Sequence, residues 1–489
     1  MIKELKSFIK HSFIYSLGNL IAKALGFFFI PIYTRYLTPK DYGILELLEL
    51  TATIISMFLG MRIGVAIIRF YYDFEKEIEK QELIGTSLLI LLFIALLIII
   101  FSQLFSREIS FLIFDTYIYG KFFKIVFLYT ALSLIASVSE SYLIARKQSF
   151  LYTIVTLSTL VSYITFNIYF IIFRKLGVLG ILYSSLITKA LNSSSLTIYC
   201  ILKNKLRFSF QKLVYILKFS LPLIPAAFGV FILNYADRFI LQKFVNTSSV
   251  GIYSLAYKFA YMLPFLVLQP IQMILTPQMF EISQKKEGIE IISKMFTYVF
   301  LIICFASLVI SIFAKDVITI MTTPAFYGAY KMIPFITLGY AFMGISNFLQ
   351  ACLMIKKRTC YIGIAVFISA LCNIFLNFFL VPKFSIMGAA YATTVSFFIM
   401  FVFFYFFSQR TLSIKYEWIR LIKIILISML IFYLSHLLKL PLIYSILFKF
   451  AVLLVFPILL FVVNFFTTEE MIYLKNIFER SAIVFVKRR

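Results

Sequence analysis

YLTPKDYGI, at residues 36–44, recurs as FVNTSSVGI at residues 244–252, and this repeated stretch decides the fold. The glycines of the two copies align at an offset of 208 residues. The same offset pairs Leu179-Gly180 with Met387-Gly388, so the second half of the chain repeats the first. Many transporters are built from two such copies, because two similar lobes can rock around a site between them.

The composition indicates a membrane protein. The chain is 62% hydrophobic, has a mean hydropathy of +0.99 and contains only 14% charged residues, whereas soluble domains contain about 25%. Apolar runs recur along its whole length, and each is long enough to cross a bilayer core of roughly 30 Å. Backbone groups in lipid must bond within their own segment, so the sequence predicts an all-α, polytopic fold.

Fourteen transmembrane helices are predicted, six in each lobe and two added at the end. An even number of spans per copy makes the lobes parallel, around a central cavity and an axis along the membrane normal. The predicted lobes are 1–208 and 209–416, and residues 417–489 supply the two extra helices and a cytoplasmic tail. The spans are 12–34, 44–66, 84–105, 122–144, 151–173, 179–201, 217–240, 252–275, 292–314, 332–354, 360–381, 386–408, 421–438 and 442–465.

The distribution of positive charge predicts that both termini are cytoplasmic. With that orientation, 28 of the 46 lysines and arginines lie on the cytoplasmic side and 13 on the opposite side, as the positive-inside rule expects. The net charge of +25 is spread over short loops, which is not the single basic patch of a nucleic-acid-binding protein. In the tail, Thr467 and Glu470 have the spacing of a helix capping box, which predicts an interfacial helix.

No motif for covalent chemistry is present. The five cysteines and two histidines form no paired spacing, so no disulfide framework, metal site or catalytic residue is predicted. The chain also carries no glycine-rich nucleotide-binding loop. We therefore expect a transporter without a cofactor, and one that uses an ion gradient.

Charged residues inside the predicted spans are the candidates for function, because a charge in hydrocarbon is costly unless it is used or paired. Two of them, Arg62 and Arg69, fall seven residues apart, and we expect them to share one helical face. Arginine suits phosphate because its guanidinium is a planar fork of N–H donors that always stays charged. The basic candidates for an anion-binding cavity are Lys23, Arg62, Arg69, Lys189 and Lys258, and the acidic candidates are Glu46, Glu49, Glu140 and Asp237.

Two interpretations of these charges stay open at this stage. Each basic residue, including Lys449 in the added pair, could instead be paired with a carboxylate or reach an interface with its long side chain. The carboxylates could be counter-ions, or they could carry H⁺ or Na⁺ for coupling.

Several stretches together resemble a known family, the polysaccharide transporters, or Wzx-like O-antigen and polysaccharide flippases, of the multidrug/oligosaccharidyl-lipid/polysaccharide (MOP) exporter superfamily. The stretches are Leu37–Gly43, Ile67–Tyr71, Ala236–Leu241, Val250–Lys258, Asn377–Pro382 and Met387–Thr393. The resemblance covers residues 1–410 or so.

The resemblance implies two six-helix bundles around a cavity and a polyprenyl-pyrophosphate-linked oligosaccharide as substrate. It implies that this lipid is turned from the inner to the outer leaflet of the cytoplasmic membrane, without enzymatic chemistry. Membrane lipids and the polysaccharide polymerase with its chain-length machinery are the implied partners, and nucleic acid is not.

Four other classes of membrane protein are alternatives to the flippase. Within the superfamily, a peptidoglycan-precursor flippase and a cation-coupled multidrug exporter stay open, although cationic drugs favour acidic sites. A membrane-embedded glycosyltransferase would need a large catalytic loop, and no predicted loop exceeds about 20 residues. A major-facilitator carrier would carry a Gly-Asp-Arg-Gly-Arg type of loop after its second span, which is not seen.

Overall fold

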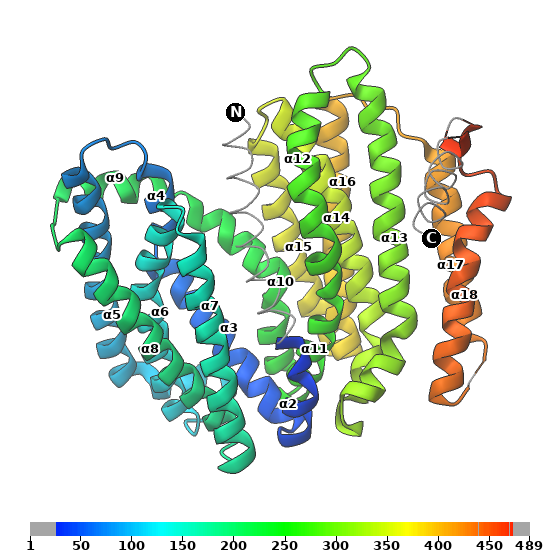
Figure 1. Cartoon of the computed structure of the whole chain (residues 1–489). Coiled ribbons are helices and arrows are strands. Elements are labelled where there is room, and N and C mark those ends of the chain that lie inside the picture. Colours follow the sequence, from blue (N-terminus) through cyan, green and yellow to red (C-terminus); the bar gives the residue numbers. More distant parts are fainter. Residues whose placement is uncertain (1–25, 439, 469, 473–489) are drawn as a thin grey trace, which may run out of the picture. The chain divides into compact units, whose positions relative to one another are not determined.

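The computed structural model describes residues 26–438, 440–468 and 470–472 (Figure 1). These residues form helices, and no strand occurs among them. In chain order the helices are α2 (Ile30–Tyr36), α3 (Pro39–Leu59), α4 (Ile63–Phe70), α5 (Glu77–Phe114), α6 (Gly120–Ala145), α7 (Ser149–Asn167), η1 (Ile168–Phe173), α8 (Val178–Asn204), α9 (Phe210–Ser220), α10 (Leu223–Phe244), α11 (Thr247–Ala260), η2 (Pro264–Leu268), α12 (Gln269–Ile282), α13 (Gly288–Met321), η3 (Pro324–Lys331), α14 (Ile333–Ile355), α15 (Cys360–Phe384), α16 (Ile386–Thr411), α17 (Trp418–His436) and α18 (Leu442–Val462).

Twelve helical segments in the described part of the chain are long and apolar enough to cross a membrane. They match twelve of the predicted spans, so the predicted all-α, polytopic membrane fold is confirmed. Most of the first predicted span, 12–34, lies outside the described residues. The sixth, 179–201, forms α8 with almost the predicted bounds, but its buried serines and Asn192 make it less apolar than the twelve.

The second predicted span, 44–66, is not one continuous helix. Helix α3 ends at Leu59, and α4 begins at Ile63. Between them Met61 and Arg62 adopt left-handed backbone angles, with φ of 47° and 53°. The predicted shared helical face of Arg62 and Arg69 is therefore wrong, because Arg62 precedes the helix that carries Arg69.

The start of α3 is fixed by local chemistry. Thr38 caps the helix, since its hydroxyl accepts from the backbone N–H of Asp41 at 3.2 Å. The Asp41 carboxylate in turn accepts from the backbone N–H of Thr38 at 3.0 Å, which completes a capping box. Pro39 occupies the first helical turn, where its missing N–H costs nothing.

Helices α3 and α11 begin at equivalent positions of the sequence repeat and cross close to their starts. A Cβ built on Gly43 would lie 3.0 Å from the backbone nitrogen of Gly251 and would collide with the carbonyl of Thr247. Only glycine allows backbones to approach this closely. The repeated stretch quoted above is therefore the point where the two copies touch.

The described residues fall into two compact units. Of the described residues, unit 1 draws on those up to Lys258, on Met321–Ala329 and on Val366–Thr393, and unit 2 draws on Phe259–Ile320, on Tyr330–Ala365 and on those from Thr394 onward. In unit 1, α6 packs between α5 and α8 (Figure 1). The division into lobes at 1–208, 209–416 and 417–489 stays a prediction.

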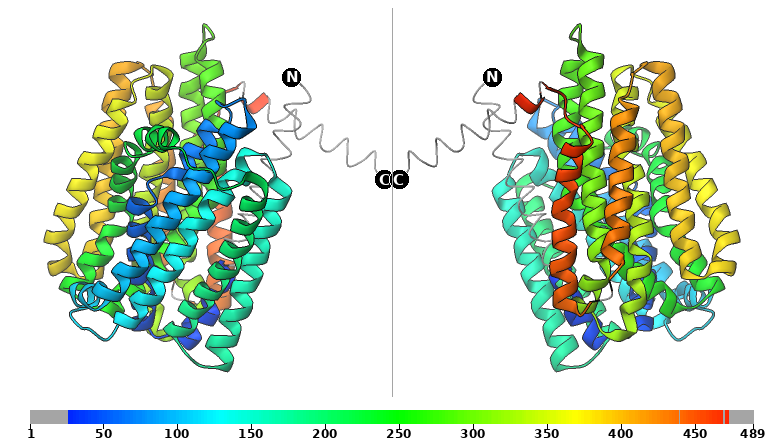
Figure 2. Two further views of the ribbon diagram at one scale, coloured as in Figure 1. Left: turned by 90° about the vertical axis from the view of Figure 1, so that its left-hand side faces the viewer. Right: turned by 90° about the vertical axis from the view of Figure 1, so that its right-hand side faces the viewer.

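In unit 2, the added helices α17 and α18 form a hairpin (Figure 2). A buried apolar cluster joins this hairpin to α13, and it includes Ile312, Ile427 and Phe456. Lys449 lies beside this cluster, and its ammonium donates to the carboxylate of Asp316 at 2.6 Å. Lys449 is therefore paired with a carboxylate, as one of the two interpretations of the sequence expected.

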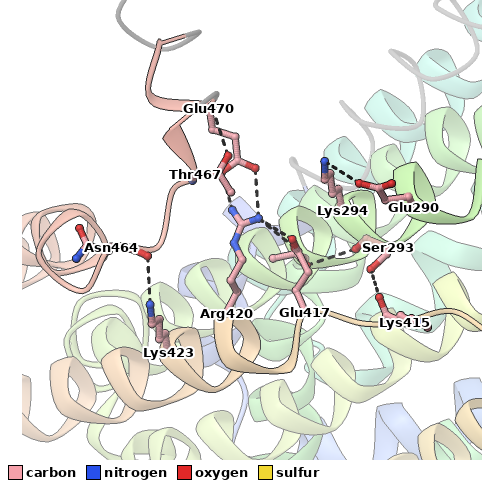
Figure 3. A network of polar contacts seen from close by, with 11 residues as sticks. Glu290, Ser293, Lys294, Lys415, Glu417, Arg420, Lys423, Asn464, Thr467 and Glu470 are labelled. Atoms are coloured by element: carbon pink, nitrogen blue, oxygen red, sulfur yellow. Dashed lines mark hydrogen bonds and ion pairs between the residues drawn. The ribbon is translucent and has the colours of Figure 1, made fainter. Parts of the chain in front are cut away.

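A polar network on unit 2 attaches the segment after α18 (Figure 3). The Arg420 guanidinium donates to Glu470 at 2.8 Å and to Glu417 at 3.0 Å. Glu470 also accepts from the backbone N–H of Thr467 at 2.8 Å, and the Glu470 N–H donates to the Thr467 hydroxyl at 3.4 Å. The predicted capping box is thus confirmed, whereas residues 473–489 of the predicted interfacial helix lie outside the described residues.

Candidate functional site

A polar cavity of about 330 Å³ lies in unit 1, among α3, α6, α7 and α8. Eight of its nine lining residues carry a hydroxyl or a charge. Most ligand pockets are lined mainly by apolar side chains, so this lining suits a ligand that forms many hydrogen bonds. The lining residues are Glu49, Tyr129, Thr156, Thr159, Leu160, Tyr163, Ser185, Thr188 and Lys189.

Charges of both signs meet at this cavity. Glu49 accepts a hydrogen bond from the Tyr129 hydroxyl at 3.1 Å. Lys189 interacts electrostatically with Glu49 and with Glu140, which accepts from the Asn192 amide at 3.4 Å. Three of the residues predicted from sequence, Glu49, Glu140 and Lys189, are therefore brought close together.

Asp237 forms a second cluster, which is fully buried in unit 1. One carboxylate oxygen accepts from the Arg238 guanidinium at 2.7 Å. The other accepts from the Tyr253 hydroxyl at 2.6 Å and from the Thr393 hydroxyl at 3.1 Å. A buried carboxylate with this many partners is compensated for its loss of solvation.

Arg238 connects this cluster to the first copy of the repeat. Its guanidinium lies 3.8 Å from the ring centroid of Tyr257, and its Nε lies 3.9 Å from a carboxylate oxygen of Glu46 on α3. The predicted counter-ions Glu46 and Asp237 thus share one cation, which the sequence candidates did not include.

Lys258 also connects α11 to α3. Its ammonium donates to the Tyr42 hydroxyl at 2.9 Å and lies 4.5 Å from the centroid of the same ring. Tyr42 itself is buried beside Gly43, while Lys258 keeps an exposed surface. The lysine therefore lies next to the crossing of the two copies, and part of its surface is exposed.

The remaining basic candidates lie elsewhere in unit 1. Arg69 is exposed on α4, and its guanidinium donates to Asp73 at 2.6 Å. Arg62 is exposed in the break before α4, and its side chain has no hydrogen bond or ion pair within the described part of the chain. Lys23 lies outside the described residues.

Sequence reasoning missed the residues that hold Asp237. The signal for Arg238 was available, since it follows Asp237 directly inside an apolar span. Tyr253 and Thr393 lie in stretches that carry the family resemblance, but nothing in the sequence indicated that they contact Asp237, because the partners come from three different helices. Within the described residues, no cluster of three His, Cys, Asp or Glu side chains could hold a metal ion.

Residues 8–283, more than half of the chain, match the family described as "Polysaccharide biosynthesis protein". The chain belongs to this family. Relatives align with it at low identity: a protein named Lsg locus putative protein 1 of Haemophilus influenzae is 24% identical over 70% of this chain and 84% of its own length.

Two further relatives are named only as membrane proteins. One from Haemophilus influenzae is 26% identical over 56% of this chain, and one from Methanocaldococcus jannaschii is 24% identical over 47% of it. The alignments cover 66% and 46% of these relatives' own length. They support a multi-pass membrane protein.

Solved structures of the MOP superfamily share the fold of this family member. A lipid II flippase, MurJ, in an inward closed conformation superposes with a TM-score of 0.75 over 91% of this chain and 98% of its own, at 18% identity. An inward-facing MATE multidrug resistance transporter superposes with a TM-score of 0.64 over 81% and 95%, at 13% identity. At these identities the likeness concerns the fold.

Proposed function

We propose that this chain is a flippase that moves an oligosaccharide on polyprenyl pyrophosphate from the inner to the outer leaflet of the cytoplasmic membrane. The observation that carries the proposal is the polar cavity in unit 1, which holds Glu49, Lys189 and six hydroxyl-bearing residues inside a bundle of membrane helices. A polar headgroup cannot cross hydrocarbon unaided. Hydrogen bonds between the hydroxyls of the cavity and those of the sugar would offset the cost of removing the headgroup from water.

The sugar is the part of the substrate that this cavity suits. Its volume of about 330 Å³ is at the small end of ligand pockets, which fits one sugar ring. Tyr129 and Tyr163 supply aromatic faces together with hydroxyls. Glu49 accepts hydrogen bonds from sugar hydroxyls, and Lys189 donates to them.

The pyrophosphate needs cations with free donors. The Arg62 side chain lacks a partner in the described part of the chain, and Lys258 is exposed although its ammonium donates to Tyr42. Arg69 is held by Asp73 but is itself exposed. We assign these three residues, with Lys23 and Lys189, to a cationic lining that attracts the anionic part of the headgroup at successive points along its path, because charge-assisted bonds to phosphate are strong.

Transport is proposed to proceed by alternating access of two lobes, with H⁺ or Na⁺ as the coupling ion. Among the carboxylates, Glu49 is the best placed to exchange an ion, because it lines the cavity and has one hydroxyl partner. Asp237 is saturated by three partners, and Glu46 lies near Arg238. The termini would be cytoplasmic, and the polymerase and chain-length machinery would act on the product.

Two alternatives within the superfamily are separated from this proposal by experiment. A peptidoglycan-precursor flippase would move a different lipid-linked saccharide, and a cation-coupled multidrug exporter would move a cation. The cavity carries a lysine beside its glutamate, which suits a neutral or anionic saccharide better than a cationic drug.

The test is made in a strain that lacks the gene. Polyprenyl-linked saccharides are extracted, weighed by mass spectrometry and assigned to a leaflet with an impermeant reagent. The proposal expects completed oligosaccharide units on the cytoplasmic leaflet, cleared by the wild-type gene. Accumulation of the peptidoglycan precursor would select the first alternative, and no accumulation together with drug sensitivity would select the second.

A further inference from the structure

Unit 1 contains a second, apolar groove between α3 and α5. It encloses about 690 Å³, and all thirteen lining residues have hydrocarbon, aromatic or thioether side chains. They include Ile55, Leu59 and Met61 on the side of α3, and Ile94, Leu97 and Phe101 on α5. The volume lies in the range of ligand pockets, and the lining offers nothing to a polar ligand.

The groove reaches the break between α3 and α4. Met61 lines the groove and is followed by Arg62, and both residues have positive φ angles. Two successive residues with side chains rarely adopt this conformation, and such strain is often kept where it serves function. Gly60 and Gly64 flank the break and lie against α6, where a Cβ at Gly64 would meet the Ser141 hydroxyl at 2.6 Å.

Arg62 places a charge at this end of the groove. The side chain of Arg62 is exposed and has no hydrogen-bond or ion-pair partner in the described residues. It also precedes α4, whose eight residues present the positive end of the helix dipole at this point. Since the backbone of Arg62 lies about 3.8 Å from that of Met61, an anion held here adjoins the apolar lining.

The depth of Arg62 distinguishes a lipid in transit from a resident phospholipid. Arg62 precedes the end of α4 by eight residues, which is about 12 Å of helix rise. The charged segment that follows, residues 73–82, runs from the loop before α5 into the first turns of that helix, contains seven Asp, Glu and Lys residues and belongs at the interface. A resident phospholipid keeps its phosphate at that interface, whereas an anion at Arg62 lies deeper, where a bare cation is costly.

We propose that this groove holds the hydrocarbon tail of the lipid-linked substrate while Arg62 holds its pyrophosphate. The inference rests on the proposed function and adds to it the lipid-recognition site. The tail stays in an apolar channel open to the bilayer, and the sugar extends from the pyrophosphate toward polar surroundings. Binding would then require both a long hydrocarbon chain and a phosphate.

The test uses the purified full chain in nanodiscs of phosphatidylglycerol, with photoreactive polyprenyl pyrophosphate as the probe. Leu97→Trp fills the groove, and Leu96→Trp is the matched control, since the neighbouring Leu96 is similarly exposed on α5 but does not line the groove. We expect labelling on α3 and α5, at least about tenfold weaker binding in Leu97→Trp, and wild-type binding in Leu96→Trp. Leu97→Asn, which keeps the shape of the leucine side chain but makes it polar, gives a second variant if the tryptophan prevents folding.

The headgroup contact is tested separately with polyprenol, which has the same tail without phosphate. Arg62→Ala is expected to remove the preference for polyprenyl pyrophosphate over polyprenol, and Arg62→Lys to keep part of it. Equal binding by the two tryptophan variants, or competition by phosphatidylglycerol as effective as by the probe, would overturn the groove proposal. Failure of the folded wild-type protein to bind the probe at all would instead contradict the proposed function.

Discussion

The backbone of Gly43 packs directly against that of Gly251, its equivalent 208 residues later in the repeat. The contact is reciprocal, because a Cβ on Gly43 would collide with the carbonyl of Thr247, and one on Gly251 would collide with the carbonyl of Pro39. Pro39 and Thr247 are themselves repeat equivalents and start α3 and α11. Such an arrangement is the mark of a local two-fold relation.

Replacing either glycine should therefore loosen this crossing. Gly43→Ala and Gly251→Ala each insert a methyl group against backbone, and overpacking of this kind costs about 1–3 kcal/mol. Thermal unfolding in detergent measures the loss. Gly363→Ala is the matched control, because no heavy atom lies within 4 Å of a Cβ added there, and a helical alanine is expected to be neutral or stabilising.

The buried Asp237–Arg238 pair should be far more sensitive to losing one partner than both. Asp237→Asn leaves the buried guanidinium with only the more distant Glu46 carboxylate, and breaking a buried pair in this way costs about 3–5 kcal/mol. Tyr253→Phe removes one hydrogen bond and costs about 1 kcal/mol. The double variant Asp237→Leu/Arg238→Met should unfold at a higher temperature than Asp237→Asn, and a double variant that is equally unstable or worse would contradict this.

The cavity residues should affect transport without affecting stability. Lys189→Ala is expected to reduce headgroup transport, and Glu49→Gln to abolish its dependence on an ion gradient while preserving the shape of the cavity. Thr53→Ala is the control, because Thr53 is exposed one turn after Glu49 but does not line the cavity. If Glu49→Gln kept full gradient-driven transport, Glu49 would be removed from coupling.

Arg62 and Arg69 should both contribute to transport, although only Arg69 is held by an ion pair among the described residues. Alanine at either position is expected to lower transport at normal membrane levels, with partial rescue by lysine. Asp73→Asn frees Arg69 from its 2.6 Å ion pair and should preserve or increase transport. An exposed pair contributes about 0–1 kcal/mol, so equal losses in Arg69→Ala and Asp73→Asn would indicate a structural role only.

The attachment of the segment after α18 should depend on pH through Glu470. Partial burial acts to raise the pKa of Glu470, but hydrogen bonds from Tyr298, from the Thr467 N–H and from Arg420 outweigh it and lower the pKa. A lowered pKa stabilises the folded state above the unfolded value of about 4.3, and this stabilisation is lost as the pH falls through the folded pKa.

Hydrogen exchange across residues 464–472 measures this attachment. Protection should be unchanged from neutral pH to about pH 5 and then fall as the pH is lowered further. Glu470→Gln should show reduced protection at neutral pH and little further change on acidification. Acid loss of protection that persisted unchanged in Glu470→Gln would assign the effect to another group.

The helices could be predicted well from the sequence, but the contacts between them could not. Apolar runs require only local information, so twelve spans agree with the structure. The break at Gly60 depends on how closely α6 approaches the end of α3, and the sequence of residues 44–66 alone does not predict it. The partners of Asp237 come from α10, α11 and α16, and only the repeat offset hinted that Gly43 and Gly251 meet.

Reconstitution gives the most direct test of whether this chain moves a lipid-linked oligosaccharide from one leaflet to the other. The saccharide lipid extracted from a strain lacking the gene is incorporated into proteoliposomes with the purified chain, under an imposed proton or sodium gradient. We expect the pool in the inner leaflet to become accessible to an impermeant glycosidase with wild-type protein, and to do so more slowly with Lys189→Ala. An inner pool that stays protected in the presence of folded wild-type protein would contradict it.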